Sequence, residues 1–418
     1  MSGSAAQGIS SAAAPNAYLR EVSSLDQTQL ALRHILEHYE GFRKFLLANQ
    51  KPTQPFHVGF SGCQGSGKTT TCETLATILR QEPYNLSVVV FSLDDLYLTR
   101  EDQKKLAADN SHNRLLEFRG QFGSHDLDLA QRLFKDLGDA HRQYLESPTS
   151  SPAVGIPRYD KSLHQGLGDR LPESQWTKVF APYDIIIFEG WSLGFKHLSD
   201  AALREAYRNS PEASKFTFEE VSKINDNLRL YEESIYPYFD IFCHMAPSSL
   251  DNVYQWRLQQ EHSMKAARGV DGMSDQQVCA FVDTYMPAYG LFLPNLTKYG
   301  FYHESQDQPQ SYEGAIRIDG QYSAPLRHLR LILNPRRRVV ESSRLDEPDR
   351  CVPYTISNWQ TKAKSLYSSP SMFRPRGSIK TWSAAAVVLV GVIAFGYRYR
   401  REVLLWGSRY RFVGRRIK

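Results

Sequence analysis

The eight residues 62–69, Gly-Cys-Gln-Gly-Ser-Gly-Lys-Thr, restrict the fold of this chain more than any other feature of its sequence. They match the pattern G-x-x-x-x-G-K-[ST] at every position, and its glycines let backbone N–H groups turn inward around phosphate oxygens. Residues 56–60 are typical of a short buried strand, and residues 69–79 of a helix, so the loop has the neighbours that the pattern requires. A chance glycine-rich turn is the alternative, which this context disfavours.

The loop predicts ATP and Mg²⁺ as cofactors. Lys68 is predicted to neutralise the β- and γ-phosphates, which gives it a catalytic role, and the hydroxyl of Thr69 is predicted to ligate the metal. The residues predicted to bind ATP are Gly62, Cys63, Gln64, Gly65, Ser66, Gly67, Lys68, Thr69 and Thr70.

Further apolar runs predict the rest of the fold. Residues 87–93, 184–188 and 238–244 are expected to form buried strands, and residues 25–47 and 249–268 carry apolar side chains at helical spacing. Such strands, separated by helical stretches, are typical of a mostly parallel sheet with helices on both faces, as in the P-loop NTPase fold of the α/β class. Ligands of such sheets bind beyond the carboxyl ends of the strands. Residues 147–157 and 166–172 are expected to be surface loops.

Carboxylates follow two of these strands and suggest phosphoryl transfer. Asp94 comes directly after the run 87–93 and is predicted to accept the proton of a substrate hydroxyl. Asp95 is expected to lie near the metal or to cap the next turn, and capping by both residues is the alternative. Glu189 follows the run 184–188, where a metal-binding acid is expected.

Arg257 is predicted to be catalytic, as part of a cationic lid over the γ-phosphate. It lies in the helical stretch 249–268, near Lys265 and Arg268. Charged residues on a helix more often form a solvent-exposed face, and this alternative interpretation of Arg257 stays open.

Two irregular stretches between the strands mix cations, polar groups and glycine. Residues 119–126 and 157–162 could recognise a small anionic or polyol substrate, or could be ordinary loops. The residues predicted to bind substrate are Arg119, His125, Asp126, Arg158, Tyr159, Asp160 and Lys161.

These motifs together resemble the glycerate 3-kinase family of plants and fungi, within the wider phosphoribulokinase and uridine kinase group. The likeness rests on the loop, on residues 92–99, 119–126, 158–162 and 188–191, and extends over residues 25–345. It implies ATP-dependent phosphorylation of D-glycerate to 3-phosphoglycerate, with Asp94 in the position of the group's catalytic aspartate. Leu96 replaces a more usual aromatic residue, and Ser124 stands where threonine is expected.

The charge distribution argues against a nucleic-acid partner. The net charge is +5, but residues 374–418 hold 11 basic residues and one acid, whereas the rest of the chain holds 39 basic and 44 acidic residues. The mildly acidic remainder of the chain lacks the excess of basic residues that binds a nucleic-acid backbone. A small hydroxylated molecule is therefore the expected partner. Five scattered cysteines indicate neither disulfides nor a zinc site and favour a cytoplasmic protein.

The sequence divides into five expected segments. Residues 1–20 are a disordered leader, 21–345 the kinase domain, 346–380 a linker, 381–397 an apolar segment and 398–418 a basic tail. The 17 uncharged residues of the apolar segment would extend about 25 Å as a helix, against about 30 Å for a bilayer core. The segment is a candidate membrane anchor with arginines at its end; a helix packed on the body or an erroneous exon are the alternatives.

Two other functions remain open at this point. One is a metabolite kinase of the uridine or pantothenate type, and the other is a nucleotide-dependent switch or adaptor that transfers no phosphoryl group. The position of Asp94 after its strand favours an enzyme.

Overall fold

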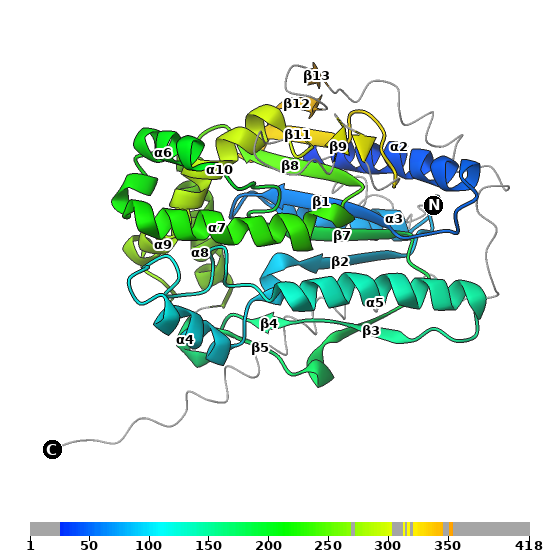
Figure 1. Cartoon of the computed structure of the whole chain (residues 1–418), viewed down its shortest axis with the longest axis horizontal. Coiled ribbons are helices and arrows are strands. Elements are labelled where there is room, and N and C mark those ends of the chain that lie inside the picture. The colour runs from blue at the N-terminus through cyan, green and yellow to red at the C-terminus, as the bar shows by residue number, and fades with distance from the viewer. Residues whose placement is uncertain are drawn as a thin grey trace, which may run out of the picture.

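The computed structural model describes residues 26–268, 272–302, 312–313, 316–317, 321–345 and 351–353. Their centre is a seven-stranded sheet with the order β13-β12-β11-β8-β1-β7-β2 (Figure 1). Its parallel strands are β2 (Val88–Ser92), β7 (Ile185–Gly190), β1 (Phe56–Gly62), β8 (Ile241–Pro247) and β11 (His328–Leu333). The antiparallel strands at one edge are β12 (Val339–Leu345) and β13 (Cys351–Pro353).

Helices cover both faces of this sheet and gather beyond its carboxyl edge. The helices are α2 (Asp26–Ala48), α3 (Lys68–Arg80), α4 (Arg100–Asp109), α5 (Leu127–Glu146), α6 (Asp200–Asn209), α7 (Phe218–Ser234), α8 (Asp251–Arg268), α9 (Asp275–Asp283) and α10 (Met286–Tyr299). In Figure 1, α7 runs along the front of β1 and β7, and α5 runs below β2, while α4, α8 and α9 lie past the left end of the sheet.

Alternation along the strands produces two hydrophobic cores. In β7, Ile185 and Ile187 belong to the core that contains the apolar faces of α2 and α3, whereas Ile186 and Phe188 belong to the core beneath α5, α7 and α10. Successive side chains of a strand point to opposite faces, so an almost wholly apolar strand fits only a sheet that is covered on both sides. The predicted P-loop NTPase fold is confirmed.

The predicted elements begin and end within a few residues of the observed ones, except in two regions. Both stretches expected to be surface loops contain short antiparallel strands: β3 (Ala153–Ile156) pairs with β6 (Thr177–Phe180), and β4 (Tyr159–Asp160) pairs with β5 (Asp169–Arg170). Runs this short carry too little apolar periodicity to be distinguished from turns. A third such pair joins β9 (Tyr312–Glu313) and β10 (Ile316–Arg317).

The strand β13 lies within the range expected to be a linker, so the sheet continues beyond Leu345. The leader, the apolar segment 381–397 and the basic tail lie outside the described residues. Among the residues that the structure does describe, no helix has both the length and the apolar character needed to cross a membrane.

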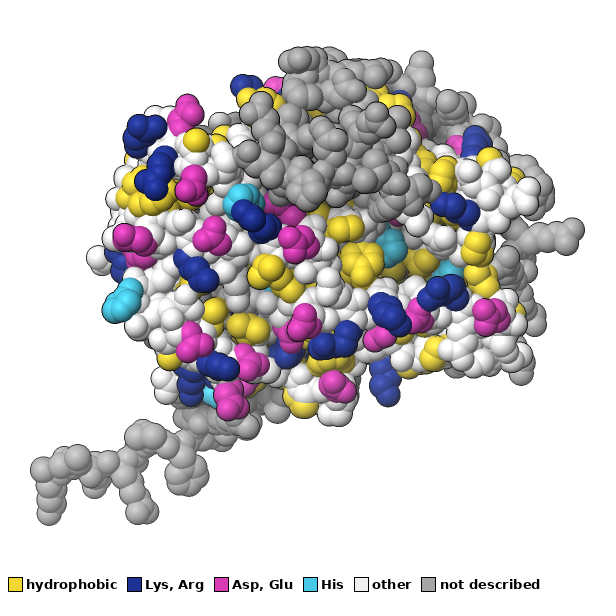
Figure 2. All heavy atoms as spheres, in the orientation of Figure 1, with side chains coloured by type: hydrophobic (Ala, Val, Ile, Leu, Met, Phe, Trp, Pro, Cys, Tyr) yellow, Lys and Arg dark blue, Asp and Glu magenta, His cyan; other side chains and the backbone are white. Residues whose placement is uncertain are grey.

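On the face shown in Figure 2, basic and acidic side chains are interspersed. Ion pairs between opposite charges occur along α5, where Lys135 and Arg142 both contact Asp139. Neither sign of charge therefore dominates that face.

Candidate active site

The loop 62–69 joins the central strand β1 to α3, which begins at Lys68. Gly67 precedes the helix with φ of 92°, and Gly65 has φ of 74°, a conformation that other residues rarely adopt. The first turn of α3 has no side-chain cap, so its N–H groups and the positive end of the helix dipole remain available to an anion.

Lys68, Thr69 and Glu189 come together at the carboxyl ends of β1 and β7. The hydroxyl of Thr69 donates to Oε1 of Glu189 over 2.9 Å, and Nζ of Lys68 lies 3.5 Å from Oε2 of the same carboxylate. Burial alone would lower the pKa of Lys68, but the charges of Glu189 and Asp94 raise it. The lysine is therefore a cation at the mouth of the loop.

Asp94 lies in a single 3₁₀ turn, Leu93–Leu96, that follows β2, and its backbone N–H donates to the side chain of Ser92. Its Oδ2 is 2.5 Å from Nζ of Lys161. Burial tends to raise the pKa of this carboxyl, but Lys161 and Lys68 together hold the pKa well below its usual range. Its other oxygen, Oδ1, is buried and has no hydrogen-bond partner among the described residues. Asp94 is thus an ionised carboxylate with one oxygen open to a ligand.

Asp95 faces a different neighbour. Its Oδ1 accepts from the backbone N–H of Tyr159 over 3.4 Å and lies 4.0 Å from the guanidinium of Arg158. Burial raises the pKa of Asp95 even though Arg158 opposes this. Through these contacts Asp95 fixes the segment that carries Lys161 against the turn of Asp94.

His125 lies under Tyr97, with ring centroids 4.4 Å apart. Its Nδ1 is 2.7 Å from the hydroxyl of Tyr231. That hydroxyl accepts a hydrogen bond from the N–H of Gly123. Burial lowers the pKa of His125 to about 3, although the charge of Asp94 acts in the opposite direction. The ring is therefore neutral, and its buried Nε2 has no hydrogen-bond partner among the described residues.

The remaining candidates for substrate binding already have partners within the protein. Asp126 caps α5 through the N–H of Leu129 and pairs with Arg170 at 2.9 Å. Asp160 accepts from the N–H and hydroxyl of Ser162. The list is completed by Arg119, which donates to the carbonyls of Gly166 and Leu167 and lies over the ring of Tyr159.

Arg257 lies on α8, where its guanidinium contacts the carboxylate of Glu261 at 3.0 Å and the face of Phe281. The helix itself packs on the phosphate loop, because a Cβ added at Gly65 would lie 2.6 Å from Cβ of Trp256. Arg257 is therefore next in sequence to Trp256, which contacts the loop, but its own guanidinium forms an ion pair with Glu261.

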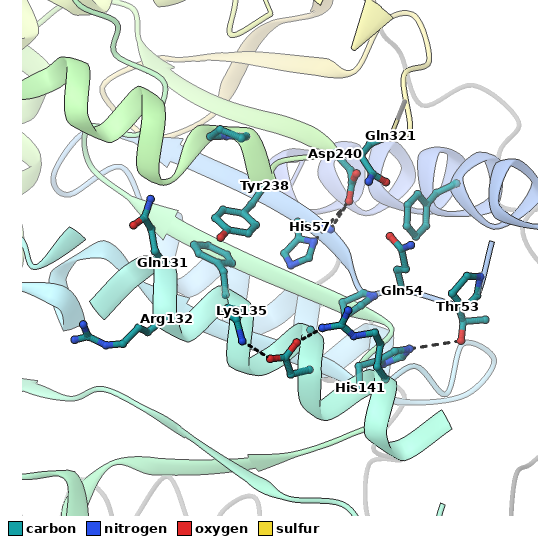
Figure 3. A pocket seen from close by; sticks show the side chains of 18 of the residues that line it. Thr53, Gln54, His57, Gln131, Arg132, Lys135, His141, Tyr238, Asp240 and Gln321 are labelled. Carbon is teal, nitrogen blue, oxygen red and sulfur yellow. Dashed lines mark hydrogen bonds and ion pairs between the residues drawn. The ribbon is translucent and has the colours of Figure 1, made fainter. Parts of the chain in front are cut away.

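A cavity of about 900 Å³ lies elsewhere, between α5 and the chain that precedes β1 (Figure 3). Its walls include His57, Lys135, Tyr238 and Asp240. None of the residues predicted to bind ATP, metal or substrate lines it. The candidate site is instead the cluster at the opposite, carboxyl edge of the sheet.

Known proteins resemble this chain in sequence and in fold. No protein-family model matches the chain. A Schizosaccharomyces pombe protein named uncharacterized kinase mug58 is 39% identical over 257 residues, which are 61% of this chain and 87% of that protein. The solved D-glycerate 3-kinase from Cryptococcus neoformans is 32% identical with a TM-score of 0.61, over 76% of this chain and 99% of that one. The chain belongs to the glycerate 3-kinase family of plants and fungi.

The Arabidopsis thaliana relative named D-glycerate 3-kinase, chloroplastic, is 36% identical over 242 residues, and the match spans 58% of this chain and 48% of that protein. The protein is accordingly an ATP-dependent phosphotransferase that acts on an alcohol group.

Two features of this kinase escaped the sequence analysis. Tyr231 on α7 orients His125, yet nothing in the sequence links residues so far apart. Trp191 directly follows β7, and its buried indole Nε1 has no hydrogen-bond partner among the described residues. Its place in the run Phe-Glu-Gly-Trp was the one signal that could have identified it.

We expect Lys68→Ala to weaken ATP binding by about 10- to 100-fold, because a buried cation beside the loop would be lost. Titration calorimetry with ATP and Mg²⁺ measures this directly. The matched control is Lys104→Ala, since Lys104 is exposed on α4. Equal dissociation constants for the two variants would contradict the role of Lys68.

Proposed function

We propose that this kinase transfers the γ-phosphoryl group of ATP to the 3-hydroxyl of D-glycerate and produces 3-phosphoglycerate. The observation that carries the proposal is the ion pair between Asp94 and Lys161, on a carboxylate whose pKa the charge of Lys68 also lowers. Lys68 belongs to the phosphate loop and Lys161 to a segment outside it. Asp94 therefore lies where a phosphate donor and an anionic acceptor would meet.

Oδ1 of Asp94 is the group that would orient the acceptor hydroxyl and accept its proton. A low pKa makes Asp94 a weak base, but phosphoryl transfer with a loose transition state needs little proton removal before the O–P bond forms. Positioning of the hydroxyl in line with the γ-phosphorus is then the larger contribution. The lysine on Oδ2 fixes the carboxylate in one orientation for this task.

The acceptor's carboxylate would lie near Lys161 and Arg158, and two neutral donors are available for its oxygens. Tyr231 accepts from Gly123, so its own proton is available to donate to Nδ1 of His125, and the single N–H proton of the neutral ring is then on Nε2. Nε2 of His125 and Nε1 of Trp191 are then buried N–H donors without a described partner. Buried polar groups rarely remain unsatisfied, which favours a hydroxylated ligand at this place.

Thr69 and Glu189 fit the Mg²⁺ that accompanies ATP. They offer hard oxygen ligands, and Oε2 of Glu189 is buried with no hydrogen bond to a described residue. When bound, the metal neutralises charge on the phosphate oxygens. Arg257 would add a cation on the α8 side if its pair with Glu261 opened.

Release of ADP with four candidate acceptors tests the proposal. We expect glycerate to stimulate turnover by at least tenfold over background, and uridine, pantothenate and ribulose 5-phosphate to leave it unchanged. Stimulation by one of the other three would identify a different metabolite kinase. No stimulation by any acceptor would instead support a nucleotide-dependent switch.

A further inference from the structure

We infer that Arg337, in the turn between β11 and β12, is a positioning residue for the phosphate loop. Its Nε donates to the carbonyl of Gly65 over 2.6 Å, although the two residues lie at opposite ends of the domain sequence. The same guanidinium donates through Nη1 to the side chain of Gln259 and through Nη2 to the carbonyl of Trp256. One side chain therefore joins the loop to α8.

The turn is built to present this side chain. Oδ1 of Asn334 accepts from the N–H groups of Arg336 and Arg338, and Arg337 itself has φ of 57°. A residue with a Cβ is strained in this left-handed conformation, and glycine would avoid that strain. The carbonyl of Pro335 also accepts from the indole N–H of Trp256, so the turn contacts α8 at a second point.

The bond to Gly65 fixes one peptide plane of the loop. The carbonyl of Gly65 and the N–H of Ser66 belong to the same rigid unit, and that N–H donates to the carbonyl of Cys63 over 3.1 Å. Both ends of the peptide are thus held before any ligand binds. The N–H groups that follow it, at the start of α3, keep the direction needed to meet phosphate oxygens.

The charge of Arg337 supports the same role. Among the described residues its partners are neutral oxygens and the face of Trp256, and no carboxylate pairs with it. Burial lowers its pKa, but a guanidinium remains charged at neutral pH. A partly buried cation without a counter-ion, beside a loop that binds anions, adds to the field that attracts the phosphates.

The inference depends on ATP binding at the loop and holds whichever acceptor the kinase uses. Equilibrium binding of ATP with Mg²⁺ to the full chain tests it without any turnover. We expect Arg337→Gly to raise the dissociation constant by about tenfold, from the loss of bonds between a cation and the loop. The thermal midpoint should stay close to that of the unchanged protein, because glycine suits this backbone conformation.

Two further variants complete the test. Arg336→Gly removes an exposed arginine from the same turn and should leave the dissociation constant within twofold. Arg337→Lys keeps the charge with a single donor group and should bind ATP with intermediate affinity. In steady-state assays the KM for ATP should rise in Arg337→Gly, while the KM for the acceptor stays within twofold. Unchanged ATP affinity in folded Arg337→Gly, or an equal loss in Arg336→Gly, would overturn the inference. If Arg337→Gly does not fold, an ATP affinity of Arg337→Lys equal to that of the wild type would overturn the inference instead.

Discussion

Replacing Asp94 by asparagine should lower kcat by about a thousandfold while the dissociation constant of ATP changes less than about threefold. The amide keeps the size of the side chain but cannot accept the hydroxyl proton, and it also loses the ion pair with Lys161. Single-turnover rates and calorimetric ATP binding, measured on the same preparation, separate the two effects.

The matched control for this change is Asp109→Asn, at the exposed end of α4, which should retain full activity. Lys161→Met provides a second check. Lys161 lowers the pKa of Asp94, so its removal should move the acidic limb of the kcat profile to higher pH. Full activity in Asp94→Asn would exclude Asp94 as the proton acceptor.

The second large effect should be loss of stability in mild acid, because five histidines are buried in neutral form. Burial lowers the pKa of His38, His125 and His244 to about 3, and lowers the pKa of His34 and His328 well below its ordinary value. Below pH 6.5 the unfolded chain binds protons that the folded protein excludes, so the free energy of unfolding falls as the pH falls.

Each of the three histidines with a pKa of about 3 removes about 2 kcal/mol of stability between pH 7 and pH 5. Together these three would lower the free energy of unfolding by about 6 kcal/mol, which is a large part of the stability of a typical domain, and His34 and His328 act in the same direction. We therefore expect the thermal midpoint to fall steeply over this interval and cooperative unfolding to be lost near pH 5. Circular dichroism melts at half-unit steps of pH would show this.

His244→Leu removes one of these groups from β8 and should flatten the pH dependence by about a fifth. The exposed His112 supplies the control, and His112→Leu should leave the slope unchanged. A midpoint that stays constant from pH 7 to pH 5 would mean that the buried histidines accept protons in the folded state.

The parts of the site that the sequence predicted are those that backbone topology brings together. Lys68 and Asp94 follow parallel strands and Glu189 is the penultimate residue of another, and the carboxyl ends of such strands meet at one edge of a sheet. Apolar runs were enough to identify those strands. Similarly, Asp126 precedes an amphipathic helix and could have been interpreted as its N-cap from the pattern alone.

Contacts made by side chains across large sequence distances could not be predicted in this way. Lys161, which pairs with Asp94, directly follows β4, and β4 and β5 form a short pair that periodicity does not reveal. Arg337 lies in a turn whose sequence is typical of any surface turn, and its partners Gly65 and Trp256 are distant from it in the sequence. Such residues depend on packing that a single sequence does not encode locally.

The central position of β1 affects how the protein forms during synthesis. Phe60 of β1 pairs with Glu189 on one side and with Cys243 on the other, so both neighbours are translated long after the phosphate loop. Non-local pairings of this kind form slowly, and an apolar strand with two open edges is prone to aggregation. During synthesis, β1 and the phosphate loop are therefore present before β7 and β8, the strands that pair with β1. An unpaired apolar strand of this kind is a segment that a chaperone could protect.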